Sequence, residues 1–505
     1  MKGAGHSAKL PIYAYPSLEI SHPMQRLSID TGSGACGSYD PDRYKRLSFL
    51  TATPSFRDGS DTPRAFLERC LETVHTLEPT VRAFAYIDEE EARQAADAST
   101  DRYRAGLPFG PLDGCPFGIK DTIETKDMPT QQNAPLFKGW SGGRDAACVW
   151  ALRQEGGVIL GKTQVPEYAM GKSPPTRNPF DTSRTAGGSS SGSGASVGAR
   201  MVPCAIGNQT MASLIRPSSF NAVYGFKPTW GALNIGGMHP LAPSQDHIGP
   251  MAATLADAWV TARRIAEQVG GHNGHPGLDG PQDLPAARKP KRLVRLDTLG
   301  WSQVDDPVRD LFERFITDLI AVGVEIIDRR NSPTVEELEQ ILVACDDYST
   351  DIVMYEARWP FLAYIDAYGR ERAIGDTAYA RMQRGIDMTP EDYRLALARR
   401  ETARRKVNEI AAGTDGFITL ASSGPAPFVE RPNVATDAPD RAGAHLETGS
   451  RSFVSPWTMI GGPALALPYL AVDGLPLGVQ LMGLPDSDTD TFAIAHWLDR
   501  AVTGD

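Results

Sequence analysis

The sequence predicts an α/β protein, and three observations support this. From Asp61 onward, segments with apolar residues at helical spacing alternate with short apolar runs typical of strands. With 41% hydrophobic and 22% charged residues, the chain has the composition of a soluble globular protein that buries a large core. At 505 residues it is long enough for two or three domains, although large α/β proteins of this length often close around one continuous sheet.

The elements follow in order along the chain. Residues 1–60 are rich in Pro, Gly, Ser and Tyr and lack sustained periodicity, which indicates an extension over the surface without a catalytic role. Asp61 is placed to cap the first helix. The predicted helices are 61–79, 89–106, 148–157, 192–201, 308–323 and most of 334–412, and the predicted strands are 81–88, 158–161, 291–297, 324–330, 416–421, 463–472 and 476–484. The long helical excursion 334–412 is expected to cap a site on the sheet and to shape its pocket.

Charge and cysteine spacing argue against several classes of partner and site. The chain carries 51 basic and 62 acidic residues, a net charge of −11, which argues against nucleic acid or an anionic membrane and favours a small-molecule substrate. Its 6 cysteines form no CxxC or close pair, so neither a disulfide framework nor a zinc site is indicated, and we expect no metal and no cofactor. Because no apolar run suits a signal peptide or a membrane span, the default location is the cytoplasm; a homodimer stays open.

One segment imitates a nucleotide-binding loop. Residues 156–163, GGVILGKT, have the spacing of a loop that cradles phosphates. Such loops lie between a strand and a helix, whereas here a helix precedes, the middle is itself strand-like, and Pro166 follows almost at once. Lys162 is therefore predicted to be a structural or surface residue.

Two other segments carry residues that suit chemistry. The Gly/Ser tract 187–194 has the composition of a flexible linker, but its place before a predicted helix also fits a tight loop whose amide groups favour an anion. Lys120 ends the apolar run PFGIK, where burial would lower the pKa of its amine and make it a general base. A buried ion pair with Asp121 is the alternative.

Several long motifs occur in a fixed order between Gly110 and Gly249. They are GPLDGCPFGIKDTIET, GGVILGKTQVPEYAMG, NPFDTSRTAGGSSSGSGASVGA, and YGFKPTWG with PSQDHIGPM, followed near the C-terminus by PALALPYLAVDGLPLGVQLMG. Together they resemble the amidase signature family of serine hydrolases. The resemblance covers most of residues 61–505, and it implies one large catalytic domain with a mixed central β-sheet covered by helices on both faces.

The resemblance also implies a catalytic triad, with Lys120 as base, Ser189 as the bridging serine after a cis peptide bond, and Ser213 as nucleophile. A serine hydroxyl is a poor nucleophile at neutral pH, so a neutral lysine would take the proton of Ser213 through Ser189 and return it to the leaving amine. Backbone N–H groups would stabilise the oxyanion, each contributing roughly 10²–10³ in rate. The expected donors are those of Thr210, Met211, Ala212 and Ser213.

Met211 and Ala212 depart from the family pattern, which normally has Thr-Gly-Gly-Ser leading into the nucleophile. The amide donors survive this change, but a β-carbon would cost about 1 kcal/mol if the backbone there requires a positive φ. Met211 would also narrow or line the acyl pocket. The sequence leaves specialisation, lost activity and deliberate substitution open.

Three further residues are candidates for the substrate site or its frame. Arg216 follows Ser213 by three residues, as in a subgroup of the family in which such an arginine holds an acidic substrate; a structural ion pair is the alternative. Met170 matches a family position that lines the acyl site, although methionine also serves simple packing. Asp246 is expected to fix a loop as a hydrogen-bond acceptor.

Three functions stay open. The first is hydrolysis of an amide or related acyl bond, in an aryl amide, carbamate or ester, through an acyl-enzyme. The second is the glutamine-hydrolysing subunit of a tRNA amidotransferase, against which the acidic composition, the run 210–213 and the extension 1–60 argue. The third is a catalytically weakened member that binds an acyl ligand or a partner. Aromatic residues of the excursion favour an apolar or aromatic ligand: Tyr348, Tyr355, Trp359, Phe361 and Tyr364.

Overall fold

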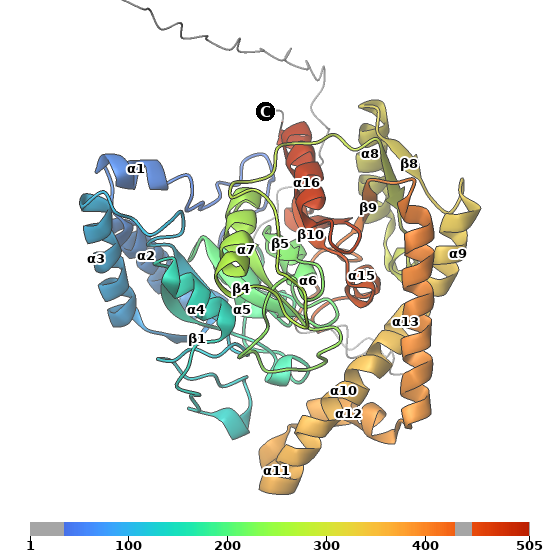
Figure 1. Cartoon of the computed structure of the whole chain (residues 1–505), viewed down its shortest axis with the longest axis horizontal. Helices are drawn as coiled ribbons and strands as arrows, with labels where there is room; N and C mark the ends of the chain where they lie inside the picture. The colour runs from blue at the N-terminus through green and yellow to red at the C-terminus, as the bar shows by residue number, and fades with distance from the viewer. Residues whose placement is uncertain (1–34, 430–446, 504–505) are drawn as a thin grey trace, which may run out of the picture.

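An 11-stranded sheet runs through the molecule (Figure 1) in the order β1-β3-β2-β4-β6-β5-β10-β11-β9-β7-β8. The computed structural model describes residues 35–429 and 447–503. The strands are β1 (Phe84–Ile87), β2 (Pro116–Lys120), β3 (Val158–Thr163), β4 (Cys204–Gln209), β5 (Tyr224–Lys227), β6 (His247–Ala252), β7 (Arg292–Arg295), β8 (Glu325–Ile327), β9 (Gly416–Leu420), β10 (Ala464–Val472) and β11 (Leu475–Met482).

The sheet is mixed, as predicted. Strand β2 pairs in parallel with both β3 and β4, and β7 pairs in parallel with β8 and β9. All pairs between these two parallel groups are antiparallel, from β4–β6 through to β11–β9, and β1 adds an antiparallel edge on β3. Lys120 is the last residue of a strand with neighbours on both sides, which places it inside the sheet.

Helices pack on both faces of the sheet. On one face lie α4 (Ala147–Gln154), α7 (Leu255–Val269) and α16 (Asp488–Thr503). Helix α7 lies between the other two and contacts both. On the other lie α5 (Ser191–Gly198) and α6 (Ile215–Phe220). The remaining helices of the body are α1 (Thr53–Asp58), α2 (Pro63–Val81), α3 (Glu89–Arg104), α8 (Asp306–Ala321) and α15 (Ser455–Ile460), with short 3-10 turns at Pro135–Phe137, Glu167–Ala169 and Leu299–Gln303.

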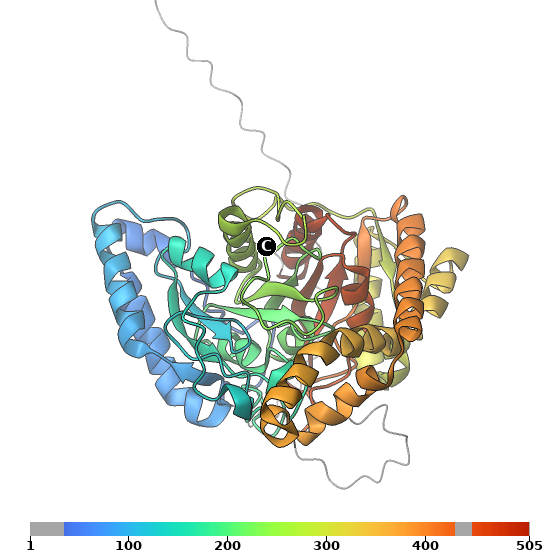
Figure 2. The ribbon, with the colours of Figure 1, turned by 60° about the horizontal axis from the view of Figure 1, so that its bottom comes forward.

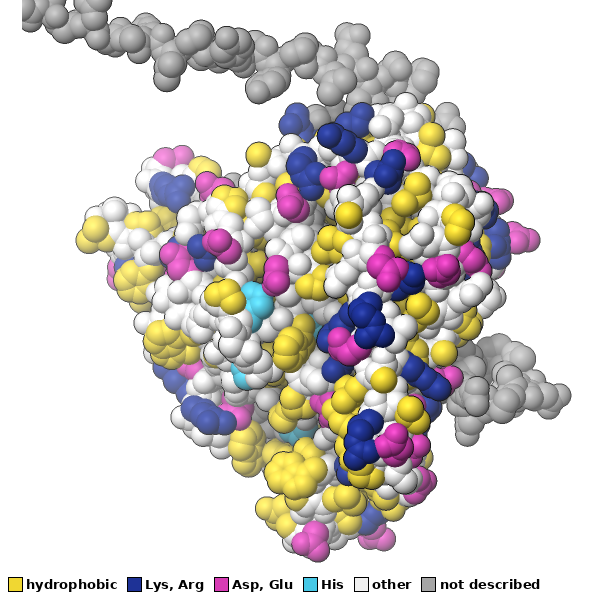
Figure 3. All heavy atoms as spheres, turned by 45° about the vertical axis from the view of Figure 1, so that its right-hand side comes forward, with side chains coloured by type: hydrophobic (Ala, Val, Ile, Leu, Met, Phe, Trp, Pro, Cys, Tyr) yellow, Lys and Arg dark blue, Asp and Glu magenta, His cyan; other side chains and the backbone are white. Residues whose placement is uncertain are grey.

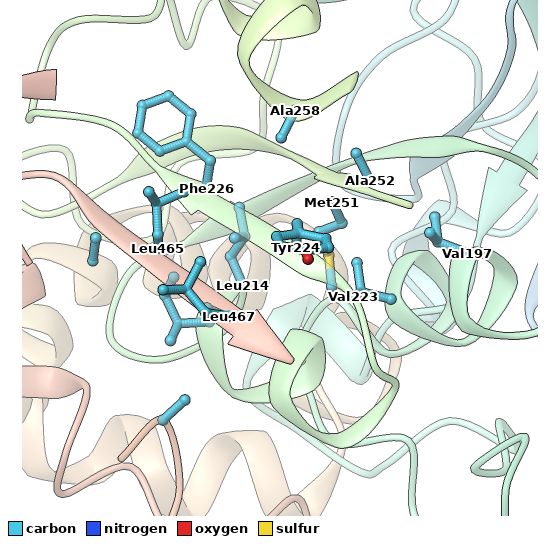
Figure 4. Packing of buried hydrophobic residues seen from close by; sticks show 14 of the residues in the cluster. Val197, Leu214, Val223, Tyr224, Phe226, Met251, Ala252, Ala258, Leu465 and Leu467 are labelled. Carbon is cyan, nitrogen blue, oxygen red and sulfur yellow. The ribbon is translucent and has the colours of Figure 1, made fainter. Parts of the chain in front are cut away.

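Apolar side chains leave the sheet on both sides to meet these helices. Figure 4 shows Phe226 of β5 on the same side of the strands as Ala258 of α7, and Met251 of β6 pointing to the opposite side. The ring of Phe226 meets that of Phe492 in α16 edge-on, with centroids 4.7 Å apart. Strands buried on both faces lose the alternation of apolar and polar residues that marks a half-exposed strand.

Near the N-terminus the structure differs from the prediction at two points. The first predicted helix is α2, and it is capped by Thr62 rather than Asp61, because the Thr62 side chain accepts from the backbone N–H of Ala65 and Pro63 begins the helix. Of the predicted extension 1–60, residues 1–34 lie outside the described residues. Within 35–60, Tyr39 and Phe49 are fully buried, so this stretch contributes to the packed interior.

The excursion is mostly helical, as predicted, with short breaks that include 343–344, 374–375 and 388–389. It comprises α9 (Pro333–Leu342), α10 (Cys345–Tyr368), α11 (Arg370–Ala373), α12 (Asp376–Asp387) and α13 (Pro390–Ala411). In Figures 1 and 2 its helices, coloured from yellow at α9 to orange at α13, lie beside the sheet. Figure 3 shows side chains of both charges interspersed over this side of the molecule. Among the described helices, none is long and apolar enough to cross a membrane.

Candidate active site

Lys120 is fully buried and touches one of the two predicted serines. Its Nζ donates to Ser189 Oγ at 2.7 Å and lies 3.4 Å from the carbonyl oxygen of Asn208 at the end of β4. The side chain has no solvent exposure. Burial disfavours an ammonium ion, and it holds the pKa of the Lys120 amine well below its ordinary value, opposed by Asp246 and assisted by Arg216.

The alternative partner of Lys120 is engaged elsewhere. Asp121 Oδ1 accepts from the backbone N–H of Gln131 at 3.1 Å and lies 3.5 Å from Lys162 Nζ. No carboxylate of the described residues lies within ion-pair distance of Lys120, so the predicted alternative of an ion pair with Asp121 does not form. An amine without a counter-ion in a dry interior is the environment that favours its neutral form.

Lys162 has the structural role predicted for it. It lies on the buried strand β3 and donates to Thr130 Oγ1 at 2.6 Å. Burial lowers the pKa of its amine to about 8. Residues 156–163 therefore form no phosphate-binding loop, because Lys162 is buried in strand β3 and its amine is hydrogen-bonded to Thr130.

The Gly/Ser tract forms a tightly packed loop, which excludes the linker interpretation. The peptide bond between Gly188 and Ser189 is cis, and Gly187 has φ +78°. A β-carbon on Gly192 would lie 2.0 Å from the carbonyl oxygen of Ala83 and 2.3 Å from the backbone nitrogen of Gln164. Only glycine permits this approach of α5 to the neighbouring backbone. The loop thus fixes Ser189 over Lys120.

The second predicted serine lies beside the same loop. The carbonyl oxygen of Ser213 accepts from the backbone N–H of Ser190 at 3.0 Å. Ser189 is 4% exposed and Ser213 is partly exposed. Both line one cavity of about 830 Å³. Lys120 and Asp246 do not line this cavity, whereas the other residues predicted for catalysis, the oxyanion site and substrate binding do: Met170, Ser189, Thr210, Met211, Ala212, Ser213 and Arg216.

The turn around Ser213 is held by the side chains of Gln209, Thr458 and Asp246. Gln209 Oε1 accepts from the N–H groups of Leu214 and Ile215 at 2.8 and 2.9 Å. Thr458 Oγ1 donates to the carbonyl of Met211 at 2.5 Å, and Thr210 Oγ1 donates to Asp246 Oδ1 at 2.6 Å. Asp246 also accepts from two backbone N–H groups, so it acts as the loop-fixing acceptor that the sequence suggested.

This arrangement leaves backbone donors for a ligand. The N–H groups of Met211, Ala212 and Ser213 donate to no other group among the described residues. Neither Met211 nor Ala212 has a positive φ. The β-carbons at these positions therefore introduce no left-handed strain, and the backbone can keep the same donor geometry with or without glycine.

Comparisons with known proteins decide the family. A family model described as Amidase matches residues 65–492. The chain belongs to the amidase family. A glutamyl-tRNA(Gln) amidotransferase subunit from Chloroflexus aggregans is 31% identical over 490 residues, spanning 90% of this chain and 96% of that protein. The corresponding protein from Salinispora arenicola is 29% identical over 473 residues, spanning 88% and 95%.

Solved structures give the same answer for the fold. The crystal structure of an amidase superposes on this chain with a TM-score of 0.77 and 29% identity, over 90% of this chain and 99% of that one. The predicted family and the predicted fold are both confirmed. Within the described residues, no group of three or more His, Cys, Asp or Glu side chains could hold a metal ion.

In this amidase-family chain Arg216 is committed to the backbone. Its Nη2 and Nε donate to the carbonyl of Gly188 at 2.6 and 3.2 Å, and its Nη1 donates to the carbonyl of Gly449 at 2.6 Å. No described carboxylate lies within 4 Å of it, so the structural ion pair is absent. Arg216 instead holds the residue that precedes Ser189.

Sequence reasoning missed Arg451, which lines the cavity together with Arg216, Arg381 and Arg384. Its Nη1 donates to the sulfur of Met211 at 3.0 Å and its Nη2 to Thr350 Oγ1 at 2.7 Å. No sequence motif marks it, because its neighbours come from segments far apart in the chain.

The aromatic residues of the excursion do not form the cavity wall. Tyr348 and Phe361 are buried in packing, Tyr355 stacks on Tyr393, and Trp359 is 73% exposed. None of the five predicted aromatic residues is among the described residues that line the cavity. The excursion contributes aliphatic and charged side chains instead, including Val353, Met354 and Asp346.

Proposed function

We propose that this chain hydrolyses an amide or related acyl bond through an acyl-enzyme on Ser213. The observation that carries the proposal is the buried amine of Lys120, which has no counter-ion and is hydrogen-bonded to Ser189. Ser189 in turn lines the same cavity as Ser213. An uncharged lysine in this position is able to accept a proton at neutral pH.

The proposed reaction begins with proton transfer from Ser213 Oγ to Ser189, while the Ser189 proton passes to Lys120 Nζ. Ser213 Oγ bonds to the acyl carbon, and the N–H groups of Met211 and Ala212 stabilise the oxyanion. Collapse breaks the carbon–nitrogen bond, and the relay returns the proton to the departing nitrogen. Water then attacks the ester carbon, gives up its proton by the same route, and frees the acid and Ser213.

The cavity wall supports an acyl group with apolar character. Met211 is 8% exposed and belongs to a buried apolar cluster with Met170, Val353 and Met354. Flexible thioethers adapt to ligands of different shape. We therefore keep aryl amides, carbamates and esters as the proposed substrate classes.

A serine-directed fluorophosphonate probe tests the nucleophile. We expect labelling of the wild type, and loss of labelling in Ser213→Ala, Ser189→Ala and Lys120→Met. The matched control is Ser302→Ala, a surface serine that bonds only the carbonyl of Leu299. Absence of labelling in the wild type at every pH would instead favour a family member that binds an acyl ligand without turnover.

A second function is favoured by the relatives that are subunits of glutamyl-tRNA(Gln) amidotransferase. Such a protein would release ammonia from glutamine for a partner to use. The same relay would serve this reaction, because the bond cleaved is again an amide.

Activity assays of the purified chain, alone and with partner subunits, distinguish the two functions. A simple hydrolase cleaves anilides, carbamates or esters as an isolated chain. A glutaminase subunit hydrolyses glutamine, and it does so faster when co-expressed partner subunits and the tRNA substrate are added. Glutamine hydrolysis without measurable anilide cleavage would replace the first proposal by the second.

A further inference from the structure

We infer that Arg451 anchors a carboxylate of the substrate, so that the bond cleaved belongs to a molecule with a free acid. The inference rests on the proposed function for the reaction, and it adds the substrate class. Arg451 lines the cavity but lies in none of the sequence motifs that resemble the family.

The first step is that Arg216 has few hydrogen-bond donors left for a ligand. Its three nitrogens all bond to the backbone carbonyls of Gly188 and Gly449. It still contributes a positive charge to the cavity, which it lines. A carboxylate attracted by this charge therefore needs its directional hydrogen bonds from another residue.

Arg451 has the donors that Arg216 lacks. One of its terminal nitrogens bonds to a hydroxyl of Thr350 and the other contacts the Met211 sulfur, which is a weak acceptor. Its Nε is buried and faces Asp346 Oδ1 at 3.7 Å, so the donors for a ligand are the remaining N–H groups of the two terminal nitrogens. A guanidinium presents five N–H donors in a planar fork that suits a carboxylate.

The charges around Arg451 leave it incompletely neutralised. Asp346 approaches only to 3.7 Å from Arg451 Nε, and its other oxygen accepts from Ser452 at 2.7 Å. The remaining acidic groups at the cavity lie toward solvent: Asp347 is half-exposed beside Arg384, and Glu447 is exposed and bonds Ser173.

Mutual repulsion among the arginines that line the cavity also favours binding of a carboxylate. Burial first, and then the charges of Arg451 and Arg381, lower the pKa of Arg216 to about 9. Burial likewise lowers the pKa of Arg451, with Arg381 and Arg384 acting in the same direction and Asp346 against them. An incoming anion relieves this repulsion and accepts hydrogen bonds from the terminal nitrogens of Arg451. The sulfur of Met211 orients the guanidinium, which gives the departure from Gly-Gly a role in selecting the substrate.

Binding to the Ser213→Ala variant tests the inference without turnover. Two matched pairs are titrated by calorimetry: glutaric acid monoanilide against the same anilide with a terminal carboxamide, and 4-acetamidobenzoate against 4-acetamidobenzamide. The pairs place the acid on the acyl side and on the amine side. We expect the acid to bind more tightly in at least one pair, by roughly 10- to 100-fold, the range of a hydrogen bond to a charged group.

Variants then assign the preference to Arg451. In the Ser213→Ala background, Arg451→Gln is expected to abolish the preference for the acid, and Arg451→Lys to retain part of it. Arg394→Gln removes the same charge from an exposed position paired with Glu391 on α13, and it is expected to keep the preference.

Several results would overturn the inference. Equal binding within both pairs, or no binding of either acid, contradicts it even if no Arg451 variant folds. An equal loss for acid and amide in Arg451→Gln would show a structural role only. Failure of the proposed function is recognised separately, because it appears as absent serine labelling in the wild type while acid binding persists.

Discussion

The chemistry of the site depends on the protonation state of Lys120. A lysine is charged in water near neutral pH, with an ordinary pKa of 10.5. Complete burial and the charge of Arg216 act against the ammonium form, and only Asp246 acts for it. The same lowered pKa that suits Lys120 to the proposed role of base also makes the stability of the folded protein depend on pH, which gives a test independent of catalysis.

Lys120→Met should change how stability depends on pH. Between the lowered folded pKa and the ordinary unfolded pKa, the unfolded wild type binds a proton that the folded protein lacks. The wild type therefore gains stability relative to the variant as pH rises, by up to about 1.4 kcal/mol per pH unit. Urea unfolding of both proteins at pH 7 and pH 9 measures this. Parallel pH dependence of the two free energies would mean that the buried amine is charged.

Met211→Gly should widen the acyl site. The side chain lies between the apolar cluster and Arg451, and the backbone there does not require glycine. We expect faster cleavage of bulky acyl groups with little change for small ones. Because Met211 faces the cavity, the stability lost should stay below the about 2–5 kcal/mol typical of truncating a core methionine. A panel of anilides of increasing acyl size measures the change, and an unaltered size profile would contradict the narrowing.

At the scale of elements, helix α5 and its approach loop place Ser189. The helix is short and buried throughout, so its position follows from how closely its backbone meets β3 and the residue before β1. Gly192 is the point of closest approach. The Gly/Ser composition that suggests flexibility in isolation therefore serves dense packing here.

Gly192→Ala should displace this helix. The added carbon meets backbone atoms that cannot rotate away, so overpacking of about 1–3 kcal/mol is expected, together with weaker labelling of Ser213. Gly413→Ala is the matched control, because its added carbon would come no closer than 3.5 Å to Arg292 Nη1. Thermal unfolding and probe labelling measure both. Full stability and labelling in Gly192→Ala would show that α5 tolerates the shift.

The excursion contributes to the cavity through α10. Met354 lines the cavity and is 6% exposed, whereas Trp359 on the same helix is 73% exposed and lies outside the lining. Met354→Phe is expected to slow cleavage of large acyl groups about tenfold, within the range of specificity set by pocket size. Trp359→Ala should leave rates unchanged. Similar effects of the two substitutions on kcat/KM would contradict a role for the excursion in shaping the pocket.

At the scale of the molecule, the sequence predicts the two sides of the sheet better than its centre. Strands β1 and β3 on one side and β7 to β11 on the other are predicted, and β10 and β11 carry the longest apolar runs, 9 and 8 residues bounded by turns. The strands β4, β6 and β5 at the centre are short and buried on both faces, and they contain glycine and polar residues such as Gln209 and His247. Such strands carry no alternation by which to recognise them.

The residues of the candidate site also differ in how well the sequence predicts them. Lys120 and Ser189 are predicted from the sequence because each lies in a long motif of local residues, and Ser213 is predicted from the resemblance to the family. Arg451 is not, because its surroundings come from the turn before Ser213 and from helix α10. Contacts of this kind depend on how distant segments pack. The resemblance also indicated a ligand role for Arg216, whose donors the structure shows to be engaged with backbone carbonyls.

The rate of Ser213 labelling as a function of pH tests the central claim most directly. If Lys120 is the uncharged base, the labelling rate of the wild type rises through a single inflection well below pH 10.5 and is high at neutral pH, while Lys120→Met shows neither the inflection nor the rate. An inflection near the ordinary lysine pKa, or a variant that labels with the wild-type profile, would contradict the account.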